Sequence, residues 1–296
     1  MVSLKHILVA TDFCPMSIIA LRHALGIAHR YGSTVSLLNV IDPSFYGMAG
    51  PDAIAAMTEC APRDADNLIC SLREEGLLDG LHLDFSARVG PVWTTIAEAI
   101  EETQAALLVL GTHGRSGLGK MVLGSVGEKA FRQASCPVLT VGPRALRAKA
   151  FGRESKQYLV PSDLSQESIN ALPYGISLAA STGGKLTLLH VLNVRAGRKR
   201  QKELLFTAQT QLNDFLKEHP EASNMVTCVA EVGDPAPTII KTAQQNQADL
   251  IVMGLHAWAD DGRPMWRTAY DVVVQAPCPV LSMKTPAKLQ QALLAS

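Results

Sequence analysis

The sequence predicts an α/β protein of two tandem domains, each an open parallel sheet with helices on both faces. One observation is an internal repeat, because segments of the first half return in the same order in the second half. A second is the continuous apolar run, such as Ile7–Ala10, which suits a strand buried on both faces. A third is the alternation of such runs with stretches of helical spacing, which favours parallel strands joined by right-handed crossovers.

The repeat sets the expected domain boundaries. It predicts a first domain over residues 1–147, a second over 155–285 and a C-terminal tail over 286–296, with a basic, irregular connection at Pro143–Ser155. Domains of this length are ordinary in size. The matched segments are Lys5–Asp12 with Lys156–Asp163, Val35–Val40 with Leu186–Val191, Val89-Gly90 with Val232-Gly233, Leu107–Gly111 with Leu250–Gly254, and Cys136–Leu139 with Cys278–Leu281.

The first domain begins with a strand near residues 4–11. After it, Ile18, Leu21 and Leu25 recur at helical spacing and predict the first helix. Pro91 lies where a later helix should begin, a first-turn position that tolerates proline. The remaining strands are expected near 34–40, 82–89, 106–110 and 137–141, with a last helix over 126–134.

The second domain repeats this order, with Pro235 at the helix start that matches Pro91. Its strands are expected near 156–161, 185–191, 225–232, 249–253 and 279–283. If the strand order in each sheet is 3-2-1-4-5, strands one and four flank the switch point, where open sheets of this kind bind ligands.

Composition favours two ordinary globular cores and disfavours some partners. Hydrophobic residues are 47% of the chain, and Lys plus Arg equal Asp plus Glu at 27 each. This zero formal charge offers no electrostatic footprint for nucleic acid or an anionic membrane, and no apolar run approaches a membrane span. Charged residues arrive too early for a signal peptide, and the six cysteines have no metal-site spacing. Reduced thiols and a cytoplasmic location are therefore expected.

A glycine pattern marks the expected ligand site. Gly111 and Gly114 follow an apolar strand, and Gly124-Ser125 opens the next predicted helix. Glycine lets backbone N–H groups approach an anion because it has no Cβ and allows positive φ. A helix N-terminus adds unpaired amides and the positive end of the helix dipole. Together these features predict a phosphate-binding loop.

With this motif and the repeat, the chain resembles the universal stress protein family in tandem form. The family's nucleotide signature, Gly-x2-Gly-x9-Gly-(Ser/Thr), is met in full in the first half. The resemblance implies Rossmann-like sheets similar to those of the adenine nucleotide alpha hydrolases. It also implies that adenine and ribose lie against Ala10, Thr11, Asp12 and Val40, and that ribose and phosphates lie against Gly111, Gly114, Gly124, Ser125 and Val126.

The second half departs from the signature. Gly254 is kept, but Ala257 stands at the second glycine, and either Trp266-Arg267 or Arg267-Thr268 stands where Gly124-Ser125 would be. A bulky side chain there should fill the phosphate space, which predicts a vestigial or altered site. The alternative is a different anionic ligand held by the guanidinium of Arg267. Asp163 and His190 are expected at the mouth of this second cleft.

The resulting hypothesis is an ATP-binding regulator of the stress response, with the nucleotide held mainly by the first domain. Any Mg²⁺ or Mn²⁺ is expected on the phosphates, since no carboxylate cluster is visible. No general base can be named, so we expect no enzymatic activity beyond slow ATP hydrolysis. The alternative is a nucleotide-free tandem scaffold that acts through protein–protein interaction.

The expected partners are an adenine nucleotide and an unidentified regulatory protein. The family resemblance further implies that the last strands, Val138–Val141 and Val280–Met283, pair as an internal pseudo-dimer. Homodimerisation of the whole chain stays open.

Other enzyme motifs fail on particular residues. Gly114–Lys120 nearly matches a Walker A loop, but Met121 replaces the Ser or Thr that would bind magnesium. ATP pyrophosphatases and adenylyl transferases carry Ser-Gly-Gly-x-Asp-Ser or His-x-Gly-His after an early strand. Thr11–Cys14 stands there instead, which argues against both.

Several single residues are interpreted as structural. His113 and His256 recur in one loop position, where packing is a better interpretation than metal binding or acid–base chemistry. The basic cluster Arg195–Lys202 is interpreted as a solvated face at a helix start. Cys14 has no neighbour expected to depress its pKa, and Ser125 has no base partner that would make it a nucleophile.

Overall fold

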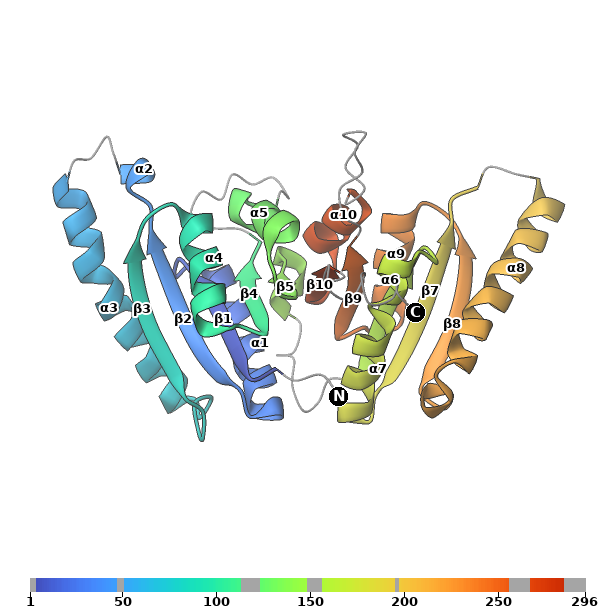
Figure 1. The fold of residues 1–296 in the computed structure, drawn as a ribbon, viewed down its shortest axis with the longest axis horizontal. Coiled ribbons are helices and arrows are strands. Elements are labelled where there is room, and N and C mark those ends of the chain that lie inside the picture. The colour runs from blue at the N-terminus through green and yellow to red at the C-terminus, as the bar shows by residue number, and fades with distance from the viewer. Residues whose placement is uncertain are drawn as a thin grey trace. The chain divides into compact units, whose positions relative to one another are not determined.

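The computed structural model describes residues 4–46, 51–112, 123–147, 156–194, 197–255 and 267–284. These residues divide into two units, one up to Leu146 and one that contains the described residues from 156 on. Each unit is an α/β sheet protein, so the predicted fold class is confirmed (Figure 1).

The first unit holds a five-stranded parallel sheet in the order β3-β2-β1-β4-β5, as predicted. Every expected strand is present, and each strand end lies within two residues of the expected one. The strands are β1 (His6–Thr11), β2 (Thr34–Ile41), β3 (Leu83–Val89), β4 (Leu107–Gly111) and β5 (Val138–Val141). The helices are α1 (Pro15–Tyr31), α2 (Pro43–Tyr46), α3 (Pro51–Glu74), α4 (Val92–Thr103) and α5 (Ser125–Gln133).

Alternate strand residues of this sheet face two different helical layers. Leu8, Leu38 and Leu108 pack with Trp93 and Ile96 of α4 in one apolar cluster, which also takes in Ala130 of α5. The residues between them, such as Ile7 and Val109, are also fully buried. Because successive strand side chains point to opposite faces, they lie under α1, which contacts β1 and β4. The sheet is therefore buried on both faces, as the continuous apolar runs predicted.

Helix ends follow local chemistry. Pro15 is the first residue of α1, where its missing N–H costs nothing. The helix ends at Gly32, whose φ of 64° is left-handed and whose N–H donates to the Ala28 carbonyl. Pro91 precedes α4 as its N-cap instead of lying in the first turn as expected, whereas Pro235 does begin its helix.

The second unit repeats the sheet in the order β10-β9-β6-β7-β8, again parallel. Its strands are β6 (Gln157–Ser162), β7 (Lys185–Leu192), β8 (Val226–Val232), β9 (Leu250–Leu255) and β10 (Val280–Lys284). Its helices are α6 (Gln166–Ile169), α7 (Leu172–Thr182), α8 (Arg198–Lys217), α9 (Pro235–Gln245) and α10 (Arg267–Gln275), with a 3₁₀ turn η2 (Pro220–Ala222).

Two local features differ from the sequence prediction. The first helix of the second unit is split into α6 and α7, because Pro173 lacks an N–H and its ring would clash with the Ile169 carbonyl of a continuous helix. The connection expected to be irregular from Pro143 starts with a 3₁₀ helix, η1 (Pro143–Arg147).

The predicted tail over 286–296 lies outside the described residues. Within the described ranges, no helix is both long and apolar enough for a bilayer.

Candidate functional site

The turn that follows β1 is held by side chains from the predicted site. The Oδ1 atom of Asp12 accepts hydrogen bonds from the Cys14 N–H at 3.0 Å and from the Ser17 hydroxyl at 2.9 Å. The Phe13 N–H donates to Thr11 Oγ1 at 3.0 Å, and the Thr11 and Ser17 hydroxyl oxygens lie 3.0 Å apart. Thr11 and Asp12 therefore have a structural role in this turn, independent of any contact with a ligand.

The same turn carries backbone strain. Phe13 has a φ of 60°, in the left-handed region that a bulky side chain seldom occupies. Such a conformation costs on the order of 1–3 kcal/mol, and strained residues of this kind gather at functional sites. The turn lies at the carboxyl end of β1, the edge at which open parallel sheets bind ligands.

Three predicted site residues from distant segments contact one apolar cluster. Ala10 and Val40 are the last residues but one of β1 and β2, and Val126 is in the first turn of α5. All three are partly exposed and pack against the α4–α5 cluster. The structure thus brings these segments together at the carboxyl edge of the sheet and leaves apolar side-chain surface open there.

The backbone on the two sides of the glycine loop is tied together. The Gly124 N–H donates to the Thr112 carbonyl at 2.9 Å, and the Thr112 N–H donates to the Val141 carbonyl at 3.1 Å. The segment between Thr112 and Leu123, with the predicted residue Gly114 and with His113, lies outside the described residues.

The N-terminus of α5 presents donors at this edge. Gly124 is the N-cap and has no side chain that could accept from the first-turn amides, while the Glu128 N–H closes the first turn onto the Gly124 carbonyl. Ser125 follows as the first helical residue, with an exposed side chain. Helix N-termini of this kind attract anions through their unpaired amides and dipole.

Gly111 and Gly124 are needed for close packing and not for a positive φ. Neither Gly111 nor Gly124 has a positive φ. A Cβ at Gly111 would lie 3.0 Å from the Met16 backbone carbon, and one at Gly124 would lie 3.3 Å from the Thr112 carbonyl oxygen. Gly111 therefore permits close packing of β4 on α1, and Gly124 permits the close approach of the loop ends.

Sequence reasoning missed Asp42, which follows β2 at the same edge. Its Oδ1 accepts from the Ser44 N–H at 2.9 Å and the Ser44 hydroxyl at 2.7 Å. These bonds, with the Val92 N–H and the charge of Lys129, outweigh partial burial and hold the Asp42 pKa below its usual range. A carboxyl just past a strand end was the available signal, since Asp12 occupies the same kind of position.

Cys14 sits in the strained turn and is not activated. Burial raises the pKa of its thiol, and the hydrogen bond and charge of Asp12 raise it further. Hydrogen bonds with Ser17 lower this pKa, but they do not offset burial and Asp12, so the Cys14 pKa stays above its usual value, in agreement with the structural interpretation of this residue. Over the described ranges, no three His, Cys, Asp or Glu side chains are grouped so as to hold a metal ion.

The second unit keeps the strained turn with different side chains. Leu164 has a φ of 66°, its N–H donates to Ser162 Oγ at 3.0 Å, and Asp163 Oδ1 accepts from the Ser165 N–H at 3.0 Å. The buried His190 donates from Nδ1 to the Ser162 carbonyl at 2.8 Å, because a carbonyl can only accept. In the first unit, the Asn39 amide makes the matching 2.8 Å bond to Thr11.

The C-terminal ends of α5 and α10 favour one alignment of the two repeats. The described helices run over Ser125–Gln133 and Arg267–Gln275, so matching Gln275 with Gln133 sets Arg267 against Ser125. Trp266 therefore matches Gly124, although it lies outside the described residues together with Ala257 and His256. The Arg267 side chain is 85% exposed and pairs with the Asp271 carboxylate, with Nε and Oδ2 4.0 Å apart.

Comparison with known proteins decides the family. The sequence model described as "Universal stress protein family" matches residues 3–142 and again residues 154–284. The chain belongs to the universal stress protein family. The two matches make it a tandem member, as the internal repeat and the glycine signature indicated.

Individual relatives of this universal stress protein agree. A universal stress protein of Methanocaldococcus jannaschii is 30% identical over 138 residues, which cover 46% of this chain and 81% of the relative. The crystal structure of a universal stress protein from Archaeoglobus fulgidus has a TM-score of 0.72 at 21% identity and covers 96% of this chain and 98% of its own. The crystal structure of a putative universal stress protein from Pseudomonas aeruginosa has a TM-score of 0.66 at 18% identity, and the match covers 99% of this chain and 98% of the other. These two structures share the fold along nearly the whole chain.

Proposed function

We propose that the first unit binds an adenine nucleotide, ATP in particular, and that the bound state regulates a protein partner during stress. The observation that carries the proposal is the convergence of Ala10, Val40 and Val126 beside the uncapped start of α5. A purine needs flat apolar contact, and phosphates need N–H donors. Both requirements are met within one edge of one sheet.

Each group has a role that its chemistry supports. Ala10 and Val40 offer apolar contact to the adenine, and the Asp12 carboxylate can accept from a ribose hydroxyl. The amides of Ser125 and Val126 and the Ser125 hydroxyl can donate to phosphate oxygens, assisted by the helix dipole. We assign Mg²⁺ or Mn²⁺ to the phosphates of the nucleotide, since hard cations bind phosphate oxygens readily.

We also propose a binding role without efficient turnover. Among the described residues, the groups at this edge are apolar side chains, backbone amides and the carboxylates of Asp12 and Asp42, whose Oδ1 atoms each accept hydrogen bonds within a turn. Such groups bind and orient a nucleotide, whereas hydrolysis needs a base that positions or deprotonates water.

Titration calorimetry of the nucleotide-stripped full chain with ATP and Mg²⁺ tests the proposal. We expect one site per chain, because the sequence of the second unit has Trp266-Arg267 where the first unit has Gly124-Ser125. Two equal sites would show that the second unit binds as well. An absence of binding heat at several temperatures would reject the nucleotide assignment.

The variant Gly124→Trp copies the second unit into the first. Its backbone, with φ −60° and ψ 159°, suits any residue, and a Cβ there would lie 3.3 Å from the Thr112 carbonyl oxygen. The fold should therefore persist with a small shift of the loop end, while the indole fills the phosphate space. Gly197→Trp is a matched control, because Gly197 is also a helix N-cap, with φ −63° and ψ 155°, and has open space around its Cβ position. We expect loss of ATP binding in the first variant alone. If both variants bound ATP equally well, the start of α5 would not be the phosphate-binding site.

A tandem scaffold without nucleotide is the second candidate. The exposed Arg267 at the start of α10 favours it for the second unit, because a long cationic side chain at a helix N-terminus opposes the helix dipole. Mass spectrometry of the protein purified without stripping distinguishes the two functions: a copurified adenine nucleotide supports the binder, and its absence together with a silent titration supports the scaffold.

A further inference from the structure

Strand β3 has one side of its backbone without a partner strand. Among the described strands it pairs with β2 alone, at the outer end of the first sheet (Figure 1). The Val35 N–H donates to the His82 carbonyl, and the Gly90 N–H donates to the Ile41 carbonyl, both at 3.0 Å. Because backbone groups alternate in direction along a strand, the even-numbered residues of β3 bond to β2. The outward N–H and C=O groups belong to the odd-numbered residues, Leu83, Phe85, Ala87 and Val89.

The matching edge strand of the second unit is protected by a side chain. The Gln209 amide of α8 donates to the Cys228 carbonyl at 2.9 Å and accepts from the Ala230 N–H at 3.1 Å. Both groups of β8 point away from β7. The repeat matches these residues with Phe85 and Ala87, and no side chain in the part of the chain that the structure describes bonds to their outward groups. A free edge of this kind is a template for another strand.

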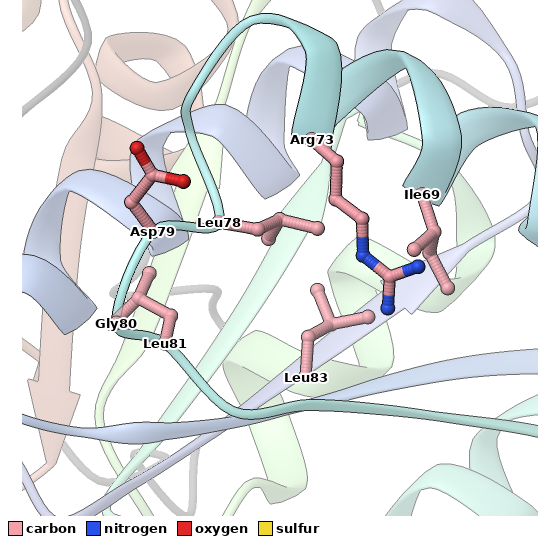
Figure 2. Close-up of a pocket in the computed structure, with 7 residues that line it drawn as sticks. All are labelled: Ile69, Arg73, Leu78, Asp79, Gly80, Leu81 and Leu83. Carbon is pink, nitrogen blue, oxygen red and sulfur yellow. The ribbon is translucent and has the colours of Figure 1, made fainter.

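Both ends of the free edge have open space beside them. Val89, in the last position of β3, is 51% exposed although it is a large hydrophobic residue. Figure 2 shows Leu83, in the first position, beside Ile69 and Arg73 of α3, where the three side chains line a cavity of about 350 Å³. Helix α3 therefore leaves room next to β3, whereas α8 occupies the edge of β8 with a side chain.

We propose that β3 pairs with β3 of a second copy of the chain, antiparallel and around a two-fold axis at Ser86. The two first units then share one continuous sheet, and the contact is isologous. Phe85 lies opposite the partner's Ala87, and Leu83 lies opposite the partner's Val89. Every outward N–H and C=O group thus meets an outward group of the partner, since odd-numbered residues face odd-numbered ones. The partner's Leu83 also covers the exposed side chain of Val89.

Charges on one face of the strand select this register. Ser86 is in register with Leu38, so Asp84 and Arg88, two residues to either side, share the face of the sheet that carries α4. In the proposed pair, Asp84 lies directly opposite the partner's Arg88. This is a position without backbone hydrogen bonds, where cross-strand side chains are closest. Moving the axis by one residue either way would set Ser86 against one of these charges and remove both ion pairs.

The contacts that these two side chains make within one chain are exposed ones. Asp84 contacts His82 at 3.0 Å, Arg88 contacts Glu102 at 2.7 Å, and the Asp84 side chain is 64% exposed. Exposed ion pairs contribute little to stability. The Arg88 guanidinium has several N–H donors, so it can keep Glu102 and also bind the partner's Asp84.

The helices leave space for the paired strands. Helix α3 packs on both β2 and β3, so it runs over their boundary, one strand spacing from the proposed axis. Two copies of α3 would then lie two strand spacings apart, about 9.6 Å, which is within the usual distance of about 8–10 Å between packed helices. Helix α4 lies farther from the axis on the other face, because it packs on β1 and β2.

Exchange of the two charges within one chain tests the register. Sedimentation velocity of the full chain over a concentration series should show a monomer–dimer equilibrium without larger species, since an isologous contact closes at two copies. Asp84→Arg and Arg88→Asp should each raise the dimer dissociation constant at least about tenfold, because each sets like charges opposite at two places in the dimer. The double variant with both changes should dimerise as wild type, because opposite charges face each other again.

A proline variant tests the backbone contact. Ala87→Pro removes one outward N–H and leaves the bonds to β2, so it should weaken the dimer while urea unfolding shows an intact fold. Val232→Pro is the matched control at an outward position of β8, and Lys217→Asp reverses an exposed charge on α8. Both controls should dimerise as wild type.

Several outcomes would overturn the proposal. They are a wild-type chain that stays monomeric, single charge variants that dimerise as wild type, and a double variant that does not regain the dimer. Equal dissociation by Val232→Pro or Lys217→Asp would overturn it as well, because the contact would then not lie at β3.

Discussion

Asp12 combines a structural bond with the proposed contact to ribose. Its Oδ1 accepts from Cys14 and Ser17, and an asparagine can keep the bond to the Cys14 N–H. We expect Asp12→Asn to keep the fold and to weaken ATP binding by about 1–2 kcal/mol, the value of a charge-assisted hydrogen bond over a neutral one. Calorimetry of ATP binding beside urea unfolding measures the two effects separately.

The second unit supplies the control for that substitution. Asp163 makes the same bond to the Ser165 N–H, so Asp163→Asn perturbs an equivalent turn. It should leave ATP affinity unchanged, and the alanine variants should follow the same order, with Asp12→Ala the weaker binder. Equal losses at both positions would mean that the two units share the ligand or that the second site is also filled.

The thiols differ in accessibility and in pKa. Burial raises the pKa of Cys136 to about 11 and, with the nearby charge of Asp249, that of Cys278 to about 12. Cys60 and Cys70 are exposed on α3. Because the thiolate is the nucleophile, iodoacetamide at neutral pH should modify only the two exposed residues of the native protein. Peptide mass spectrometry of dilute protein checks this, and rapid modification of Cys136 or Cys278 would contradict it.

At the scale of elements, the strands could be predicted from the sequence, but the structural reason for a glycine at some positions could not. Continuous apolar runs such as Ile7–Ala10 need two covered faces, which restricts them to buried parallel strands. The split between α6 and α7 was foreseeable from Pro173. The packing of Gly111 against Met16 was not, because it depends on how closely α1 approaches β4.

The candidate site, too, could be predicted from the sequence only in part. The positions of Ala10 and Val40 follow from strand ends and sheet order, so their convergence with Val126 follows from topology. The role of Asp42 could not be predicted without the structure, since its partners Ser44 and Val92 come from two different helices. The left-handed φ of Phe13 has no local sequence signal, because bulky residues rarely adopt it.

Helix α1 gives the fold a defined pH dependence through His23. This side chain is 1% exposed, and burial lowers its pKa to about 4. The folded pKa thus lies below the unfolded value of about 6.5, so the unfolded chain binds more protons between these limits. Stability should fall as pH falls from about 6.5 toward 4, with a slope approaching about 1.4 kcal/mol per pH unit from this one group.

Urea unfolding at a series of pH values measures that slope. His23→Gln should flatten the dependence between pH 6.5 and 4 relative to wild type, although it costs stability at neutral pH. His29→Gln is the control, because His29 lies on the exposed side of the same helix. A wild-type slope retained in His23→Gln would show that other groups govern the acid sensitivity.

At the scale of the whole molecule, the two repeats share one fold but differ in the predicted nucleotide signature. Both keep the sheet order, the aspartate turn and a left-handed residue after it, at Phe13 and Leu164. They differ in the nucleotide signature, where Gly124-Ser125 of the first unit is matched by Trp266-Arg267 and Gly114 by Ala257. These replacements separate the predicted binding unit from its twin.

This divergence predicts a one-sided response to nucleotide. A ligand stabilises the state that it binds in proportion to its occupancy, and amide exchange slows where opening is suppressed. Saturating ATP and Mg²⁺ should slow hydrogen exchange around Asp12, at the end of β2 and at the start of α5, and leave the turn at Asp163 and helix α10 unchanged. Exchange measured by mass spectrometry on the full chain resolves these peptides. Equal protection in both units would show that Arg267 accommodates the ligand and that the second site is active, whereas protection confined to the first unit would make the second a partner surface available in both nucleotide states.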